Sequence, residues 1–567
     1  MPRVDEARLV LLLFALLAAA KLLLVFGVLG TPGPICFQDE LIYKENAQLL
    51  AAGQPFATGQ YPPLYSLLLA PAFLFGSSWY SIMLLINVLI TSAIIFPVWL
   101  ISRHLLPKPW HLAPVALSAL LPFQAVFPRM LMSENLFLPL FLFAFYFALV
   151  RPRGARFSGL MLGTACALAY LTRFLFLPAV PILFALWWLG DRKKTGAADA
   201  GIAIGSFAAM LIPWLAYAGL SGIGIIYALG VDVFPAAGQN AAKRTGEMLA
   251  TLMSAYASYL ALAAAPFILF ILLCAWMAFK GKVKISGTEQ LFFGAVACLS
   301  VAYCSVSVLY SWNAPYNYPA PQYLLGRYAM QLTPLFIIAG MAALCKLWEA
   351  RRSISAPALC GSTFIALALA YGAHGILCEG RLFHLKNYFA NSVFNSVDAA
   401  SYNTPPLFMA LLGVIALAAL LLYFSRIAKP AQGRYALLSI FALLLLLQAS
   451  FSAVSAAKVA LHEQWPEHGR ALAPIFNADV AGGARAIYLV LDVGGLDRNN
   501  LEYSLQFWGV PKGAVVVAQA PGDAALASSA SKRYVLTGKK FRNPLLSYYV
   551  RGREFYLYDY DAISGTY

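Results

Sequence analysis

Long apolar runs, separated by short charged segments, dominate the chain up to residue 457. The first run, LVLLLFALLAAAKLLLVFGVLG at 9–30, has the length that a helix needs to cross a bilayer. Runs of this kind predict about thirteen spanning helices. They lie near 9–30, 79–101, 111–127, 134–150, 157–174, 175–190, 199–218, 257–279, 289–310, 328–345, 355–377, 406–424 and 435–457.

Composition agrees with a polytopic membrane protein. The mean hydropathy is +0.72, 61% of the 567 residues are hydrophobic and only 11% are charged. A soluble fold would lack the polar residues to cover so much apolar surface. The net charge of +16 does not indicate a nucleic-acid partner, because the basic residues form small groups between the apolar runs.

The basic residues of alternate loops predict the orientation. One set of loops carries nineteen lysines and arginines, and the other set, without the C-terminal tail, carries eight although its loops are longer. The positive-inside rule therefore places the N-terminus in the cytoplasm, and an odd number of spans places the C-terminus outside. We expect a multi-pass protein of a bacterial inner membrane, with the first run kept as an uncleaved helix.

The sequence pattern changes near residue 461. The segments AIYLVLD, AVVVAQA, KRYVLTG and REFYLYD are short β-type runs separated by turn residues, and NNLEYSLQFWG is typical of a helix ending in Gly. We therefore expect two domains: a transmembrane domain at 1–460 and an extracytoplasmic α/β domain at 461–567. The second has no Gly-rich phosphate loop, nucleophile elbow or cysteine, and no chemistry is assigned to it.

Thiols and histidines give no diagnostic pattern. The eight cysteines contain no CxxC pair, and Cys36 and Cys378 are the two on the predicted outer side, where a disulfide is one alternative. No cofactor is predicted. A divalent metal remains an alternative, since four histidines fall on or near the outer side: His374, His384, His462 and His468.

The stretch FQDELIYKENAQLL at 37–50 places a carboxylate pair, Asp39 and Glu40, where the first span ends. It opens a long outer loop, 31–78, in which ELIYKENAQLLAAG has a helical pattern with Gly53 as the C-cap. Helix capping by Asp39 would explain one carboxylate. It does not explain so long a loop rich in Tyr and Pro.

Further charges occur at the same predicted depth. Glu134 follows Ser133 at the start of the fourth span. Either its carboxylate interacts favourably with the positive end of the helix dipole, or it faces Asp39 across one cavity. Arg173 and Arg327 lie on the outer side against the charge bias, where an arginine usually has an anionic partner. Either they pair with these carboxylates or they hold a phosphate, which suits a planar guanidinium.

QDELIYKENAQLLAAGQPF…YPPLYSLLLAP resembles the first outer loop of polyprenyl-phosphate-sugar-dependent glycosyltransferases of the GT-C class. That class includes protein O-mannosyltransferase-like enzymes and the lipid A aminoarabinose transferase, whose thirteen spans and outer α/β domain are similar. The matching pieces are Asp39-Glu40 with Tyr43, Tyr61-Pro62-Pro63, Ser133-Glu134, and Gly326-Arg327-Tyr328 with Pro334.

The resemblance implies inverting transfer of a sugar from a polyprenyl-phosphate carrier to an extracytoplasmic lipid, glycan or protein. It implies that Asp39 is the general base and that Arg327, with Arg173 second, holds the donor phosphate. It also implies that Glu40 and Glu134 orient the base or bind hydroxyls. Tyr43 and Tyr61 would then line the sugar pocket.

The chain departs from the aminoarabinose transferase where that enzyme carries basic residues in the loop. Ile42 and Tyr61-Pro62-Pro63 stand in that region, which argues against aminoarabinose as the sugar. The sugar, the acceptor and the carrier's length stay open.

Two other readings also stay open. The first is a transporter or flippase, for which Lys21 is the one clear charge within a span. The second is a polymerase or ligase that uses the same carriers, with Arg381, His384 or Lys386 of loop 378–405 as functional residues.

Overall fold

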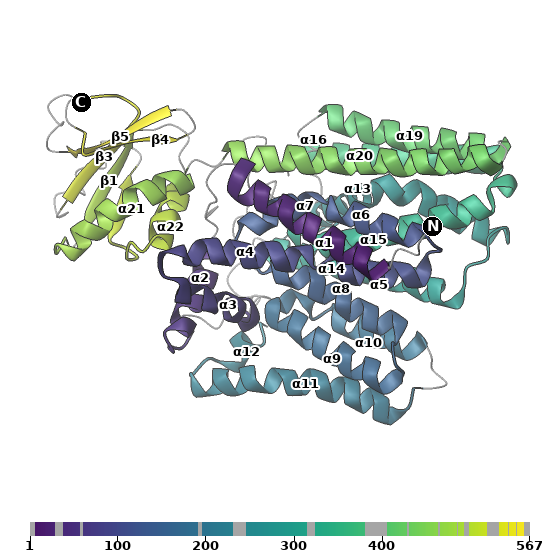
Figure 1. The fold of residues 1–567 in the computed structure, drawn as a ribbon, viewed down its shortest axis with the longest axis horizontal. Helices are drawn as coiled ribbons and strands as arrows, with labels where there is room; N and C mark the ends of the chain where they lie inside the picture. Colours follow the sequence, from purple (N-terminus) through teal and green to yellow (C-terminus); the bar gives the residue numbers. More distant parts are fainter. Residues whose placement is uncertain are drawn as a thin grey trace.

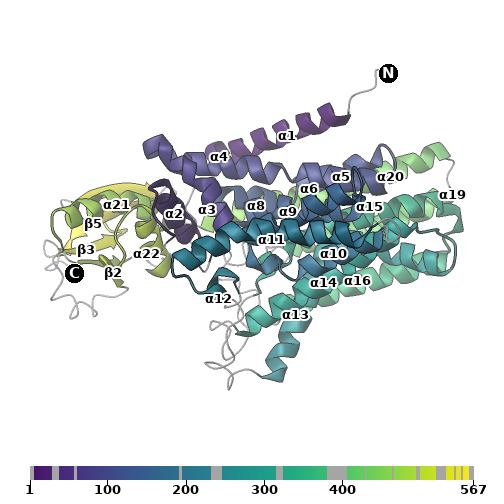
Figure 2. The same cartoon turned by 90° about the horizontal axis from the view of Figure 1, so that it is seen from below.

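The computed structural model describes residues 6–28, 38–56, 61–190, 195–230, 245–313, 324–379, 405–427, 430–462, 465–484, 486–492, 498–518, 532–541, 544–550 and 553–560. These residues form an elongated bundle of helices with a small α/β unit at one end (Figures 1 and 2). The first helix begins at the end of the bundle that is far from this unit (Figure 1). The predicted class, a polytopic helical membrane protein with a C-terminal α/β domain, is confirmed.

The bundle consists of apolar helices of very unequal length. In chain order they are α1 (Glu6–Leu22), α4 (Trp79–Ser92), α5 (Ile95–Leu105), α6 (Ala113–Ala119), α7 (Pro122–Val126), α8 (Glu134–Val150), α9 (Ala155–Thr172), α10 (Ala179–Gly190), α11 (Ala197–Leu220), α13 (Gly246–Phe279), α14 (Gly287–Asn313), α15 (Thr333–Glu349), α16 (Ala356–Glu379), α19 (Pro405–Ile427) and α20 (Pro430–His462).

Every predicted span falls on one of these helices or helix pairs, but the count of thirteen is not confirmed. Among the described residues nine helices are long and apolar enough to cross a membrane, or ten if the bent pair Trp110–Ala119 and Pro122–Arg129 is one span. Three predicted spans account for the difference: α8 and α10 have only 17 and 12 residues, and the 18-residue α9 is not among these helices either. Arg173 is extended, with φ −151° and ψ 117°, and this break shortens the helix that follows it.

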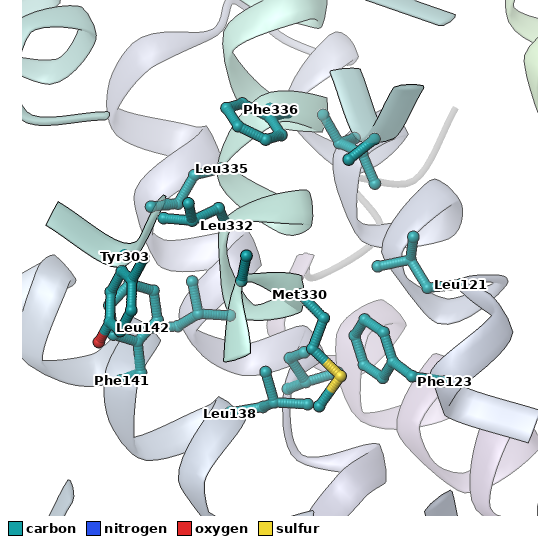
Figure 3. Packing of buried hydrophobic residues seen from close by; sticks show 14 of the residues in the cluster. Leu121, Phe123, Leu138, Phe141, Leu142, Tyr303, Met330, Leu332, Leu335 and Phe336 are labelled. Carbon is teal, nitrogen blue, oxygen red and sulfur yellow. The ribbon is translucent and has the colours of Figure 1, made fainter. Parts of the chain in front are cut away.

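Close packing fixes the centre of the bundle. α9 packs against α8 and α11, and α13 packs against α15 and α16. Figure 3 shows side chains from the start of α15 and the turn before it meeting those of α7, α8 and α14. In this view the Met330 side chain lies between Leu138 and Phe123, and all three are at most 2% exposed. The chain just after Arg327 is therefore anchored in the core.

In its described part, the predicted outer loop (31–78) contains the short helices α2 (Gln38–Ala51) and α3 (Pro63–Leu69), followed by a 3₁₀ segment at Ala70–Ser78. α2 buries the apolar residues Leu41, Tyr43 and Ala47 together with the polar residues Glu40, Lys44 and Asn46. It ends as predicted at Gly53, whose φ of +70° suits glycine, while the amide of Gln54 donates to the carbonyl of Leu49 at 2.8 Å. Pro63 opens α3, where its missing N–H carries no cost.

The C-terminal unit is a five-stranded sheet in the order β2-β1-β3-β5-β4, with two helices. β1 pairs in parallel with β2 and β3, whereas β5 is antiparallel to β3 and β4. The four predicted strands and the predicted helix are present, and β4 and α21 were missed. The elements are α21 (Trp465–Ala481), β1 (Ile487–Asp492), α22 (Arg498–Phe507), β2 (Val515–Ala518), β3 (Lys532–Thr537), β4 (Leu546–Val550) and β5 (Arg553–Asp559).

An aromatic contact joins this unit to the bundle. Phe507, at the end of α22, lies 5.6 Å from Trp79 and 5.4 Å from Tyr80, measured between ring centroids. The same buried cluster contains Leu41 and Tyr43 of α2. The outer loop is thus packed between the ends of the bundle helices and the α/β unit, as Figures 1 and 2 show.

Candidate functional site

The first turn of α2 presents Asp39, whose two carboxylate oxygens have different partners. The Tyr61 hydroxyl donates to Oδ1 at 2.8 Å, and Nη1 of Arg327 donates to Oδ2 at 3.0 Å. Arg327 is 288 residues away in sequence, so the contact joins the outer loop to the segment before α15. Asp39 is only partly buried, with a side chain 24% exposed.

Arg327 stands in a 3₁₀ turn, Gly326–Tyr328, that is held from behind. The amide of Leu325 donates to the Tyr256 hydroxyl at 2.9 Å, which is itself 2.7 Å from the hydroxyl of Ser311. On the other side of the turn, the Tyr310 and Tyr328 rings meet edge to face at 5.1 Å. These contacts from α13 and α14 orient the turn and the guanidinium that it carries.

Glu134 begins α8 and forms an ion pair with Nη1 of Arg173. Its Oε1 is also 3.9 Å from Nη1 of Arg327. The Arg173 guanidinium lies over the rings of Phe137 and Tyr328, at 5.8 and 5.4 Å from their centroids. Burial of two arginines at one place is tolerated because carboxylates and aromatic faces surround them.

Two carboxylates and two guanidiniums thus form one cluster in which Arg327 contacts both acids. Burial alone would lower the pKa of Arg327, but Tyr328, Asp39 and Glu134 raise it, so the guanidinium stays charged. Burial, and then the charge of Asp39, raise the pKa of Tyr61. The phenol therefore keeps its proton and remains a hydrogen-bond donor to Asp39.

Aromatic side chains form one wall of this cluster. Tyr43 meets Tyr61 edge to face at 5.3 Å and Tyr65 at 5.0 Å. Burial, with the charge of Asp39 second, raises the pKa of Tyr43, which is 4% exposed. Ser133, at the N-cap of α8, makes no side-chain hydrogen bond to the helix backbone.

The structure brings together most of the predicted site residues at the bundle end that faces the α/β unit. Asp39, Tyr61, Arg327, Glu134 and Arg173 are linked by direct contacts. Glu40 differs: it is fully buried, and its Oε2 accepts from the backbone amide of Leu131 at 2.9 Å. This bond directs it to the turn before α8.

Sequence reasoning missed the neutral residues that support the cluster, among them Tyr256, Ser311 and Tyr310. They lie in apolar runs, where a tyrosine or serine is common. Asn87, fully buried within α4, was missed as well. An amide inside a spanning run is a signal that could have identified it.

Several predictions fall on residues that the structure does not describe. They include Cys36, the side chain of Cys378, and Arg381, His384 and Lys386. Within the described ranges no group of three or more His, Cys, Asp and Glu could hold a metal ion. His374 stacks on Phe408 at 3.9 Å, and His468 contacts Tyr548, so these two histidines lie in different parts of the fold.

No protein-family model matches the chain, and neither does any curated protein. Among solved structures, the chain is similar to ArnT from Cupriavidus metallidurans in the apo state, with 14% identity, 98% of each chain covered and a TM-score of 0.49. For the same protein bound to undecaprenyl phosphate the values are 13%, 97% of each chain and 0.48. The apo Archaeoglobus fulgidus oligosaccharyltransferase matches at 13% identity and a TM-score of 0.34, covering 71% of this chain and 59% of its own.

At these identities and TM-scores the likeness assigns no role to any residue and no substrate to this chain. What the protein does must follow from the chemistry of the cluster.

Proposed function

We propose that the chain is an integral-membrane glycosyltransferase of the GT-C class. It would move a sugar from a polyprenyl-phosphate carrier to an extracytoplasmic acceptor, with inversion. The observation that carries this proposal is the shared contact of Arg327 with Asp39 and Glu134, at 3.0 and 3.9 Å, beside Arg173. A partly exposed carboxylate next to two buried guanidiniums provides a base and an anion site in one place.

Asp39 is the proposed general base. It takes the proton of the acceptor hydroxyl while the hydroxyl oxygen attacks the anomeric carbon. The bond between that carbon and the phosphate oxygen breaks, and the polyprenyl phosphate leaves with the bonding electron pair. One displacement of this kind inverts the anomeric centre. Tyr61 supports the base by fixing one carboxylate oxygen, which leaves the other to Arg327 and the acceptor.

The two arginines are the proposed donor-phosphate site. Charge develops on the phosphate oxygens as the glycosidic bond breaks, and fixed guanidiniums stabilise it without reorganisation. Arg327 is the first choice because it touches the base as well, so it can couple phosphate binding to the position of Asp39. Glu134 keeps Arg173 in place.

The remaining predicted residues have supporting roles in this proposal. Tyr61, whose ring meets the buried Tyr43 edge to face, offers the surface against which a sugar ring can pack, and Tyr43 supports it from behind. Glu40 orients α2 through Leu131 rather than binding sugar or acceptor directly.

The expected orientation agrees with this arrangement. With the N-terminus in the cytoplasm of an inner-membrane protein, the cluster and the α/β unit both stand on the extracytoplasmic side. A carrier inserted in the bilayer would reach the cluster from the lipid, and an acceptor would reach it from the aqueous side. A lipid, a glycan or a protein could each supply the hydroxyl.

A transporter or flippase is the alternative, and Lys21 is the feature that favours it. Its ammonium group donates to the Thr91 hydroxyl at 3.1 Å and to the amide oxygen of Gln124, and the residue is 2% exposed. The lysine thus bonds neighbouring helices within the packed bundle. A substrate path would instead be lined by exposed ionisable groups.

The test uses the purified full-length chain in liposomes with a panel of radiolabelled polyprenyl-phosphate sugars and candidate acceptors. We expect sugar to leave one donor, polyprenyl phosphate to appear in equal amount, and the product to have the opposite anomeric configuration. Carrier that crosses the bilayer with its sugar still attached would contradict the proposal and support the transporter.

A further inference from the structure

The turn between Arg129 and α8 determines where Glu134 lies. Met130 is extended, with φ −121° and ψ 143°, and the next residues are not helical until α8 begins. Met130 and Leu131 are fully buried, and Glu134 is 1% exposed. A buried segment of this kind needs partners for its backbone groups, because water cannot satisfy them.

The Met130 carbonyl is the centre of this turn. It accepts from the side-chain amide of Asn87 at 2.8 Å, from that of Asn135 at 2.9 Å and from the backbone amide of Met132 at 2.9 Å. Asn135 and Met132 belong to the same stretch of chain, but Asn87 comes from α4. Its bond is therefore the one of the three that fixes the turn to a different helix.

Asn87 is itself held in a single orientation. The Tyr65 hydroxyl donates to its Oδ1 at 2.8 Å, so the amide nitrogen must point to Met130. One helical turn further along, the Thr91 hydroxyl donates to the Asn87 carbonyl at 2.7 Å and accepts from Lys21 at 3.1 Å. α4 and α1 lie side by side (Figures 1 and 2), and this chain of bonds joins them.

The other side of the turn meets the outer loop. The amide of Leu131, next to Met130, donates to Glu40 at 2.9 Å, and Glu40 adjoins Asp39 in α2. The short turn at Met130 and Leu131 thus lies between Glu134, which contacts the arginines, and α2, which carries the proposed base Asp39. A shift of this turn would move Glu134 and Asp39 relative to each other.

We propose that Asn87 is a positioning residue for the transfer reaction: its amide holds the Met130 carbonyl and thereby sets the geometry between Glu134 and Asp39. This inference rests on the proposed function. A displacement of about 1 Å at a reacting centre can cost on the order of 10²-fold in rate, so Asn87 can matter without touching a substrate.

The first test compares Asn87→Leu with Ser92→Ala in the full-length chain. Leucine has a similar size but can neither donate nor accept. Ser92 is a matched control: it is fully buried in the same helix, and its hydroxyl donates to the Val88 carbonyl of that helix at 2.6 Å, with no bond to another helix among the described residues. We expect kcat to fall roughly 10–100-fold in Asn87→Leu, with a smaller change in KM for the donor, and Ser92→Ala to resemble the wild type.

A second variant, Asn87→Asp, tests the donor directly and keeps an acceptor for Tyr65. Only the protonated acid can donate to the Met130 carbonyl, and burial favours that neutral form. We expect the kcat of this variant, relative to the wild type, to fall as pH rises. A ratio that stays constant with pH would overturn the inference, since a general packing defect does not depend on that proton.

A third readout does not need the activity. Hydrogen exchange of a peptide covering 128–136 reports the Leu131 amide and its neighbours. Faster exchange in Asn87→Leu than in Ser92→Ala supports the inference, and equal exchange overturns it. If the wild type transfers no sugar from any donor, the proposed function fails and this exchange measurement alone decides the role of Asn87.

Discussion

Among single residues, Arg327 has the most informative environment, because its guanidinium contacts two carboxylates at once. Its Nη1 is 3.0 Å from Asp39 and 3.9 Å from Glu134, and the side chain is 11% exposed. Arg173 brings the second guanidinium, so the four charges formally balance. An incoming phosphate adds negative charge. In the proposed reaction the arginines would share their donors between this phosphate and the carboxylates, which would keep the phosphate close to Asp39.

Replacing Arg327 by Lys is expected to lower kcat by roughly 10²-fold. The compact lysine ammonium lacks the planar set of N–H donors with which the guanidinium can contact two carboxylates and a phosphate at the same time. Turnover of the labelled donor measures this. Arg352→Lys, at an exposed position of the turn after α15, is the control and should leave the rate unchanged. Equal rates in the two variants would remove Arg327 from the phosphate site.

Tyr61→Phe tests the support of the base. It deletes one 2.8 Å hydrogen bond to Asp39 and keeps the ring that packs on Tyr43. Hydrogen bonds to charged groups contribute about 1.5–3 kcal/mol, so we expect kcat to fall on the order of 10-fold. Tyr227→Phe, at a ring 47% exposed, is the matched control. No difference between the two would mean that the phenol does not orient Asp39.

The charged residues of the cluster could be predicted from the sequence more easily than the neutral residues that support them. Asp39, Glu134, Arg173 and Arg327 are conspicuous because charge is rare in so apolar a chain and each stands close to the end of an apolar run. The Glu40–Leu131 bond joins residues 91 positions apart, and no local pattern encodes it. A neutral amide such as Asn87 costs less to bury than a charge, so it changes the hydropathy pattern little.

Among the helices, the close packing of α9 against its neighbours holds the cluster in place. α9 ends at Arg173 and packs along α11, and Gly163 is where the two backbones approach. A Cβ on Gly163 would lie 2.1 Å from the Ala203 carbonyl oxygen and 2.9 Å from the Phe207 amide nitrogen. Small residues permit such contacts between membrane helices.

Gly163→Ala should therefore force α9 and α11 apart and lower stability by about 1–3 kcal/mol. Thermal unfolding in detergent measures this as a lower Tm. Gly205→Ala on α11 is the matched control, because a Cβ there meets no atom within 4 Å. A Tm for Gly163→Ala as high as that of the control would contradict the close approach.

Helix positions follow from hydropathy, but helix lengths do not. The spans predicted at 157–174 and 175–190 meet next to Arg173, where the backbone is extended and the side chain pairs with Glu134. α13 has 34 residues and extends well beyond the apolar stretch predicted at 257–279. Tertiary contacts, which a window of hydropathy does not contain, set both boundaries.

In the molecule as a whole, the α/β unit packs against one side of the predicted outer loop. Its Phe507 belongs to the same buried cluster as Tyr43, which packs on Tyr61. Strand alternation and turn residues were enough to predict four of its strands. The packing of Phe507 against Trp79 and Tyr80 could not be predicted from the sequence. Aromatic residues near the end of a membrane span are as typical of a contact with lipid as of a contact with another domain.

His468 makes this unit sensitive to acid. The residue is fully buried in α21, hydrogen-bonds Tyr548 at 2.6 Å, and has its pKa lowered by burial from 6.5 to about 4. The unfolded chain therefore binds more protons between these values. The stabilisation from the neutral ring is complete above pH 6.5, and about 3 kcal/mol is lost as pH falls to 4.

Hydrogen exchange of β1 and β5 in the full-length chain, measured between pH 7 and 4 with correction for the intrinsic rate, tests this. We expect protection to fall below pH 6.5 and His468→Phe to lose that part of the pH dependence. The same pH dependence in the variant would assign the effect to other groups.

In the proposed reaction Asp39 acts as the base of sugar transfer from a lipid phosphate. The most direct test of this role compares donor turnover by the wild type, Asp39→Asn and Glu45→Gln, at equal protein levels in membranes. Glu45 lies on the same helix, takes no part in the ion pairs described for the cluster, and controls for a change of carboxylate to amide. We predict a loss of roughly 10²–10⁴-fold in Asp39→Asn and none in Glu45→Gln. Turnover by Asp39→Asn equal to that of the wild type would contradict the account.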